Sequence, residues 1–166
     1  MGVTRQLGFG RVGRVADGAH SLDARQLRAW RVFVQMQEHL RSRIEQQLQA
    51  ASGLSMADYS VLAVLAGAGP GRLRAHELGN LLGWEKSRLH HQLTRMTGRG
   101  LVRRQAGQSR AVHIELTGPG WAALTEAAPR HSEHIHDLVM APLSDEEVDQ
   151  LAGLSAKILA NMRSLD

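Results

Sequence analysis

The sequence predicts a mainly α-helical protein with a small β-wing, a winged helix-turn-helix set in a frame of longer helices. Three observations support this fold class. Apolar residues recur at steps of three and four over most of the chain after residue 20, as in amphipathic helices. Residues 110–116 instead alternate between apolar and polar side chains, as a strand does. Two short apolar-striped segments meet at Gly83, and two short helices joined by a tight glycine turn form a helix-turn-helix.

The bulk composition predicts an ordinary folded domain. Of the 166 residues, 43% are hydrophobic and 22% are charged, so a core of normal size can form. The chain has no cysteine, which excludes disulfides, thiolate nucleophiles and cysteine-ligated zinc. Apolar runs are too short to cross a bilayer, and the N-terminus lacks the apolar stretch of a secretory signal. We therefore expect a cytoplasmic protein with one domain, residues 21–166.

The first twenty residues are rich in glycine and arginine and show no apolar period. They contain a match to a glycine-rich phosphate loop from Gly8 to Gly13, which makes a nucleotide-binding enzyme one alternative. Such a loop requires a preceding strand and a βαβ unit, and neither is predicted here. We expect residues 1–20 to form a flexible basic arm and the protein to have no catalytic residues.

Helices account for most of the rest of the chain. The first covers residues 22–51, with Ser21 as its N-cap and Asp23 in its first turn; at about 45 Å it is long enough to pack on a partner. The second opens with Ser55 and Asp58 as a capping box and ends in the glycine-rich residues 67–71. Shorter helices follow at about 75–82 and 85–97, and together with the wing they place the winged helix-turn-helix at residues 55–117.

After the helix at 85–97, residues 101–104 read as a strand that pairs with residues 110–116. Thr117 can cap the next helix, in which Pro129 imposes a kink. The sequence Ser-Asp-Glu-Glu from Ser144 is a capping box that opens the final helix.

Charge along the chain is uneven. Residues 72–110 hold nine basic residues and two acids, whereas residues 111–166 hold three basic residues and nine acids. A compact basic centre beside an acidic flank indicates a polyanionic partner for the centre, although a solvated charged face is the plainer alternative.

The outer face of the helix at 85–97 favours nucleic acid. Leu89, Leu93 and Met96 form its inner face, and no acid lies on the opposite side. That opposite side carries Ser87, Arg88, His91, Gln92 and Arg95, which can all bond to base edges or phosphates in a major groove. Arg110 at the wing tip can reach the neighbouring minor groove. The predicted DNA-binding residues are Lys86, Ser87, Arg88, His90, His91, Gln92, Arg95, Arg103, Arg104 and Arg110.

Four stretches together resemble the multiple-antibiotic-resistance regulator (MarR) family over about residues 22–163. They are residues 82–89 (LGWEKSRL), 92–96 (QLTRM), 99–104 (RGLVRR) and 116–120 (LTGPG). The resemblance implies a sequence-specific transcriptional regulator, a homodimer whose dimerisation helices are residues 22–51 and 118–163, and double-stranded operator DNA with a palindromic site. It also implies repression relieved by a small anionic or aromatic effector. Family members usually have an acid where this wing has Gln108.

Ligand and metal sites are less sharply indicated. Aromatic or soft side chains near the first two helices could line an effector pocket, or could simply be core: Trp30, Met36, His39, Met56 and Tyr59. A cluster of His131, His134 and His136 with nearby acids makes a zinc-responsive regulator of the same fold a second alternative. Exposed polar positions on an interface helix are the simpler interpretation, so we expect no metal and no cofactor. A non-specific architectural DNA protein is a further alternative.

Overall fold

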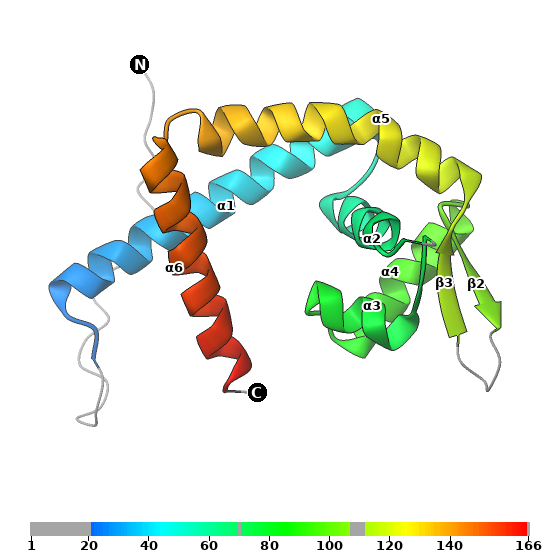
Figure 1. Ribbon diagram of the computed structural model, residues 1–166, viewed down its shortest axis with the longest axis horizontal. Helices are drawn as coiled ribbons and strands as arrows, with labels where there is room; N and C mark the ends of the chain where they lie inside the picture. The colour runs from blue at the N-terminus through cyan, green and yellow to red at the C-terminus, as the bar shows by residue number, and fades with distance from the viewer. Residues whose placement is uncertain (1–20, 70, 107–111, 166) are drawn as a thin grey trace, which may run out of the picture. The chain divides into compact units, whose positions relative to one another are not determined.

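The computed structural model describes residues 21–69, 71–106 and 112–165. The predicted basic arm, including the loop from Gly8 to Gly13, and the wing tip with Arg110 lie outside the described residues. The chain is mostly helical (Figure 1). The elements follow in the order α1 (Ala24–Ser52), α2 (Met56–Gly67), β1 (Arg72–Arg74), α3 (Ala75–Leu82), α4 (Lys86–Gly98), β2 (Val102–Ala106), β3 (Val112–Leu116), α5 (Gly118–Ile135), the π-helical turn η2 (His136–Met140) and α6 (Asp145–Arg163).

The chain divides into two compact units, one ending at Met36 and the other beginning at Gln37. In the first unit, α1 begins at Ala24 rather than at the predicted Leu22. The N-cap is Asp23 and not Ser21, because a reciprocal pair of bonds fixes the helix start there. The Asp23 carboxylate accepts from the Gln26 N–H at 2.8 Å, and the Gln26 side chain accepts from the Asp23 N–H at 2.9 Å.

The core of the second unit is built around α2. Val61, Leu62 and Leu65 are fully buried, and α3, α4, α5 and the sheet all contact this helix. Leu48 from the last turns of α1 and Met96 from α4 are also fully buried. The helix-turn-helix and the wing therefore share one hydrophobic core with α5.

The sheet has three antiparallel strands in the order β1-β3-β2. Val102 pairs with Leu116 and Ala106 with Val112, which is the predicted wing. The third strand corrects the prediction of a two-stranded wing: Arg72–Arg74 pairs with β3, with Arg74 opposite His113. Three residues are too few to show an alternating pattern, and their partner lies about forty positions later in the chain.

The ends of the helices after α1 follow the sequence closely. The capping boxes predicted at Ser55 and Ser144 are both formed. Gly83 ends α3 in the left-handed conformation (φ +62°), which a residue with a side chain adopts at a cost, so this turn of the helix-turn-helix favours glycine. The helix α5 continues through Pro129 to Ile135.

Thr117 caps α5, as predicted, and also links the end of β3 to the turn before β2. Its hydroxyl accepts from the Gly120 N–H at 3.0 Å and points at the carbonyl oxygens of Gly100 (2.6 Å) and Leu101 (3.0 Å). The end of β3 is thereby fixed to the turn before β2. No single helix in the described part of the chain is long and apolar enough to cross a membrane.

Candidate nucleic-acid interface

One side of α4 is exposed, polar and free of acids. Leu89, Leu93 and Met96 are buried in the core, so the opposite side faces solvent. No Asp or Glu occurs anywhere between Lys86 and Gly98. The exposed positions between Lys86 and Arg95 form what we call the α4 outer face: Lys86, Ser87, Arg88, His90, His91, Thr94 and Arg95.

The structure places Gln92 differently from the prediction. Its side chain is only 3% exposed, and its amide nitrogen donates to the Asp58 carboxylate at 2.7 Å. Gln92 stands three positions after Leu89 and four before Met96, so it falls on the inner side of the helix. That spacing was visible in the sequence. We therefore remove Gln92 from the set of DNA-contacting residues.

Arg88 lies against an aromatic ring at the start of α4. Its guanidinium carbon is 4.4 Å from the centre of the Trp84 ring, within the range of a cation–π contact. Arg88 makes no ion pair within the described part of the chain. Its charge is consequently held in place without being neutralised.

The two arginines of β2 lie on opposite faces of the strand. Arg104 reaches α4, where it donates to the Thr94 hydroxyl at 3.1 Å and approaches the His90 carbonyl oxygen at 3.4 Å. Arg103 instead pairs with Glu115 on β3 at 3.0 Å. Hydrogen bonding within this pair raises the pKa of Arg103 and lowers the pKa of Glu115. Arg104 therefore extends the α4 outer face, whereas the charge of Arg103 is balanced by an acid.

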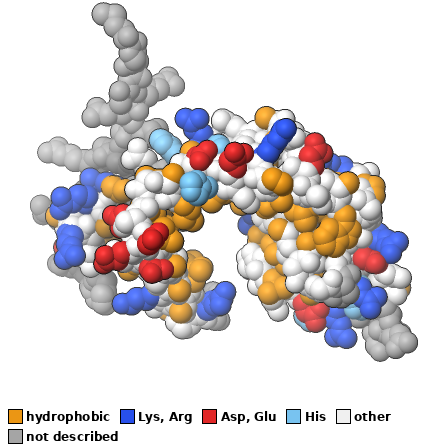
Figure 2. Space-filling model, turned by 45° about the horizontal axis from the view of Figure 1, so that its top comes forward, with side chains coloured by type: hydrophobic (Ala, Val, Ile, Leu, Met, Phe, Trp, Pro, Cys, Tyr) orange, Lys and Arg blue, Asp and Glu red, His pale blue; other side chains and the backbone are white. Residues whose placement is uncertain are grey.

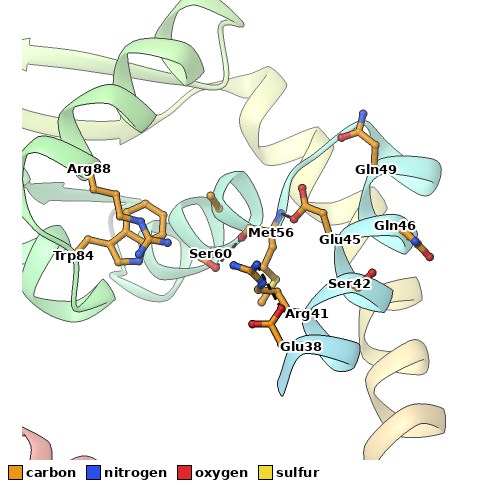
Figure 3. A pocket seen from close by; sticks show the side chains of 11 residues that line it. Glu38, Arg41, Ser42, Glu45, Gln46, Gln49, Met56, Ser60, Trp84 and Arg88 are labelled. Carbon is orange, nitrogen blue, oxygen red and sulfur yellow. Dashed lines mark hydrogen bonds and ion pairs between the residues drawn. The ribbon is translucent and has the colours of Figure 1, made fainter. Parts of the chain in front are cut away.

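A groove of about 840 Å³ opens beside the start of α4 (Figure 3). Its lining combines charged, amide and hydroxyl side chains with three apolar ones. It comes from the second half of α1, the first half of α2, the α3–α4 turn and the first turn of α4. Figure 3 shows Trp84 and Arg88 facing Met56 and Ser60 across it. The lining residues are Glu38, Arg41, Ser42, Glu45, Gln46, Gln49, Met56, Ala57, Ser60, Trp84 and Arg88.

The predicted effector residues do not come together in this groove. Of the five, only Met56 lines it. Tyr59 packs instead against His131, and His39 is exposed. Trp30 and Met36 belong to the unit that ends at Met36 and are also exposed there. The sequence identified residue types suited to ligand binding, but not the faces from which they project.

The histidines of α5 are partly buried. The ring of His131 lies 4.3 Å from that of Tyr59, and burial, with a smaller contribution from His134, lowers the pKa of His131. Nδ1 of His131 and Nε2 of His134 are buried without a hydrogen-bond partner. His136 is exposed beside Asp137. Among the described residues, no three potential metal ligands gather into one group.

Comparisons with known proteins agree with this arrangement. The model of the MarR family matches residues 52–111. The HTH-type transcriptional regulator PecS of Dickeya dadantii (strain 3937) is 31% identical over 108 residues, which are 63% of this chain and 64% of PecS. The alignment thus spans less than two thirds of PecS.

Two solved structures from Streptomyces coelicolor are similar over most of the chain. Sco3205, a MarR family transcriptional regulator in complex with DNA, has a TM-score of 0.84 and 28% identity, with 88% of this chain and 92% of Sco3205 covered. AbsC, a MarR family transcriptional regulator, has a TM-score of 0.83 and 30% identity, with 88% of this chain and 99% of AbsC covered. The winged helix-turn-helix, the acid-free α4 outer face and these likenesses agree, and the chain belongs to the MarR family.

Proposed function

We propose that the protein is a sequence-specific transcriptional regulator that binds double-stranded DNA through the α4 outer face. The observation that carries the proposal is the run of exposed basic and polar side chains on α4, with no acid among them, extended by Arg104 from the wing. A helix with such a face fits the major groove. In this scheme Ser87, Arg88, His91 and Arg95 contact base edges, and Lys86, His90 and Arg104 contact phosphates.

The likeness to Sco3205, whose structure contains DNA, supports this placement. Arg110 is proposed as a minor-groove contact on the sequence argument alone. Arg103 is a weaker candidate for a DNA contact than its position in the sequence suggested, because its charge is already balanced by Glu115.

We propose further that the regulator is a homodimer on a palindromic operator. The helix α6 carries an apolar stripe at helical spacing, of which Leu154, Ile158, Leu159 and Met162 are each at least 50% exposed. Orange apolar side chains are visible at the surface in Figure 2, close to the acids (red). Contiguous exposed apolar side chains on a folded protein mark an interaction surface. Two copies related by a two-fold axis would present two α4 helices to two half-sites.

We also propose that the protein is a repressor that a small effector releases from DNA. We expect this regulator to act in the cytoplasm. The groove beside Trp84 supports effector control, because it includes Arg88, a member of the α4 outer face. A small anionic or aromatic molecule that engaged Arg88 there would compete with DNA for the same guanidinium.

The test begins with selection of duplexes from a random DNA library by the full-length protein. We expect one enriched palindrome, with an affinity that falls steeply as salt is added, because each neutralised phosphate contributes a slope of about −0.9. Arg95→Ala should weaken binding to the selected duplex by about ten-fold and broaden the sequence preference. Arg130→Ala removes an equal charge from α5 and serves as the control. Absence of any enriched sequence at low salt would refute the proposal.

A further inference from the structure

A buried polar network joins the start of α2 to the α4 outer face. Its centre is Asp58, which is 4% exposed. One carboxylate oxygen, Oδ1, accepts from Nε2 of Gln92 at 2.7 Å. The other, Oδ2, accepts from the Ser55 N–H (2.9 Å), the Ser55 hydroxyl (2.8 Å) and the Arg99 guanidinium (2.7 Å). The two oxygens of one carboxylate therefore serve different partners.

Gln92 connects Asp58 to Arg95 through hydrogen bonds at the two ends of its side-chain amide. Its amide oxygen, Oε1, accepts from the Arg95 guanidinium, while its amide nitrogen faces Asp58. An amide satisfies both neighbours in one orientation only, with nitrogen toward the carboxylate and oxygen toward the guanidinium. The charge of Asp58 thus fixes the direction of the Gln92 amide, and that direction decides whether Arg95 has an acceptor beside it.

We propose that Asp58 and Gln92 are positioning residues that hold Arg95 in the orientation in which it reads a base; this rests on the proposed function, which makes Arg95 a base-contacting residue. Arg95 is an exposed, long side chain with many rotamers. A bond to a buried acceptor restricts that freedom before DNA arrives, so less freedom is lost on binding. Neither Asp58 nor Gln92 touches DNA itself, since both are buried.

The carboxylate is itself fixed by the fold. Asp58 is the third residue of α2 and closes its capping box with Ser55. Arg99, at the end of α4, also donates to the Gly53 carbonyl oxygen at 2.9 Å, which holds the α1–α2 turn against the same helix. Asp58 and Arg99 are therefore each held by several hydrogen bonds, whereas the exposed Arg95 is held in this network only through Gln92.

An isosteric variant, Asp58→Asn, tests the role of charge. Three donors converge on the position of Oδ2, so the new amide will place its oxygen there and its nitrogen toward Gln92. Gln92 must then turn its own oxygen toward that nitrogen, which leaves a donor facing Arg95. The Arg95 bond is lost although no side chain has become smaller. Gln92→Met, of similar length and without polar atoms, removes the same bond by a second route.

Ser55→Ala is the matched control. It removes a bond to Oδ2 and the cap of α2, so it destabilises the protein, but it leaves Oδ1, Gln92 and Arg95 unchanged. Binding is measured on the full-length protein with the selected duplex and with a scrambled duplex of the same length and composition. The quantity compared is the ratio of the two affinities, which a purely structural effect lowers little because it weakens both.

We expect Asp58→Asn and Gln92→Met to lower this ratio by about ten-fold, the size of one lost base contact, and Ser55→Ala to leave it within about two-fold. In the Arg95→Ala background neither variant should lower the ratio further, because the group they position is gone. Equal losses on both duplexes, or undiminished losses in the Arg95→Ala background, would overturn the positioning role. If Arg95→Ala alone leaves the ratio unchanged, the base-reading assignment itself is refuted and the positioning role with it.

Discussion

Among the glycines in the described part of the chain, Gly120 is the one at which an added methyl group should damage the fold most. It is buried in the first turn of α5, and a Cβ built there overlaps the Leu101 carbonyl oxygen. The same Cβ would lie 3.1 Å from the Leu101 carbonyl carbon and 3.3 Å from Cδ2 of Leu116. The first of these obstacles is backbone, held by the Thr117 hydroxyl, so it cannot rotate away as a side chain could.

The cost of Gly120→Ala follows from two contributions. Forcing a methyl into a packed site costs roughly 1–3 kcal/mol, and displacing Gly120 weakens the Thr117 cap, which is worth about 1 kcal/mol. We expect a loss of about 3 kcal/mol in the free energy of unfolding, or about 6 to 12 °C in Tm for a chain of this length. Gly118→Ala is the matched control, because a Cβ at Gly118 meets nothing within 4 Å.

The assay is urea unfolding of both variants at one fixed protein concentration, since the proposed dimerisation would make the midpoint depend on concentration. Gly118→Ala should match or slightly exceed the wild-type midpoint, because alanine favours helix over glycine. A Gly120→Ala variant as stable as Gly118→Ala would show that α5 does not rest on the Leu101 backbone as described.

Three further outcomes are expected. Glu115→Gln should raise the affinity for random DNA at low salt roughly two- to three-fold, by leaving Arg103 unbalanced; fluorescence anisotropy measures this, and weaker binding would contradict it. Burial lowers the folded-state pKa of His131 below its usual 6.5, so the unfolded chain takes up the proton first and stability falls as pH drops below about 6.5. His131→Gln should flatten that fall in urea midpoints between pH 7 and 5, and an unchanged slope would argue against it. Ile158→Glu should turn the dimer into monomers in light scattering, and a persisting dimer would move the interface away from the α6 stripe.

Local features of the sequence predicted local features of the fold well. The caps at Ser55, Thr117 and Ser144 each pair a residue with the one three positions later, so both partners can be found within a short stretch of sequence. The strands of the wing are joined by a short connection, so their pairing could also be predicted from the sequence. The buried side of α4 was also predicted correctly, because Leu89, Leu93 and Met96 recur at helical spacing within one short segment.

One miss is local, since the N-cap of α1 is Asp23, paired with Gln26 three positions later, and not Ser21. The others involve distant partners. The strand β1 forms because Arg72–Arg74 pairs with β3, and the sequence of those three residues does not predict a strand. Gln92 looked like a DNA contact because its chemistry suits adenine, but Asp58, thirty-four positions earlier, satisfies the same amide inside the protein. The predicted effector residues likewise do not meet in the groove beside Trp84, and Tyr59 packs against a histidine of α5 instead. Residue type suggests what a side chain can bind, and only the fold determines what lies within its reach.

The short strand β1 has a consequence for the dynamics of the domain. It leads directly into α3 at Ala75 while its backbone is bonded to β3, and β3 is bonded on its other side to β2. We therefore expect the helix-turn-helix and the wing, which are joined by the chain and by the strand hydrogen bonds, to behave as a single cooperative unit. In hydrogen exchange, the ladder amides of all three strands should open together rather than strand by strand. Such a unit would move on DNA as one piece, so the wing could not be released without disturbing the helix that precedes α4.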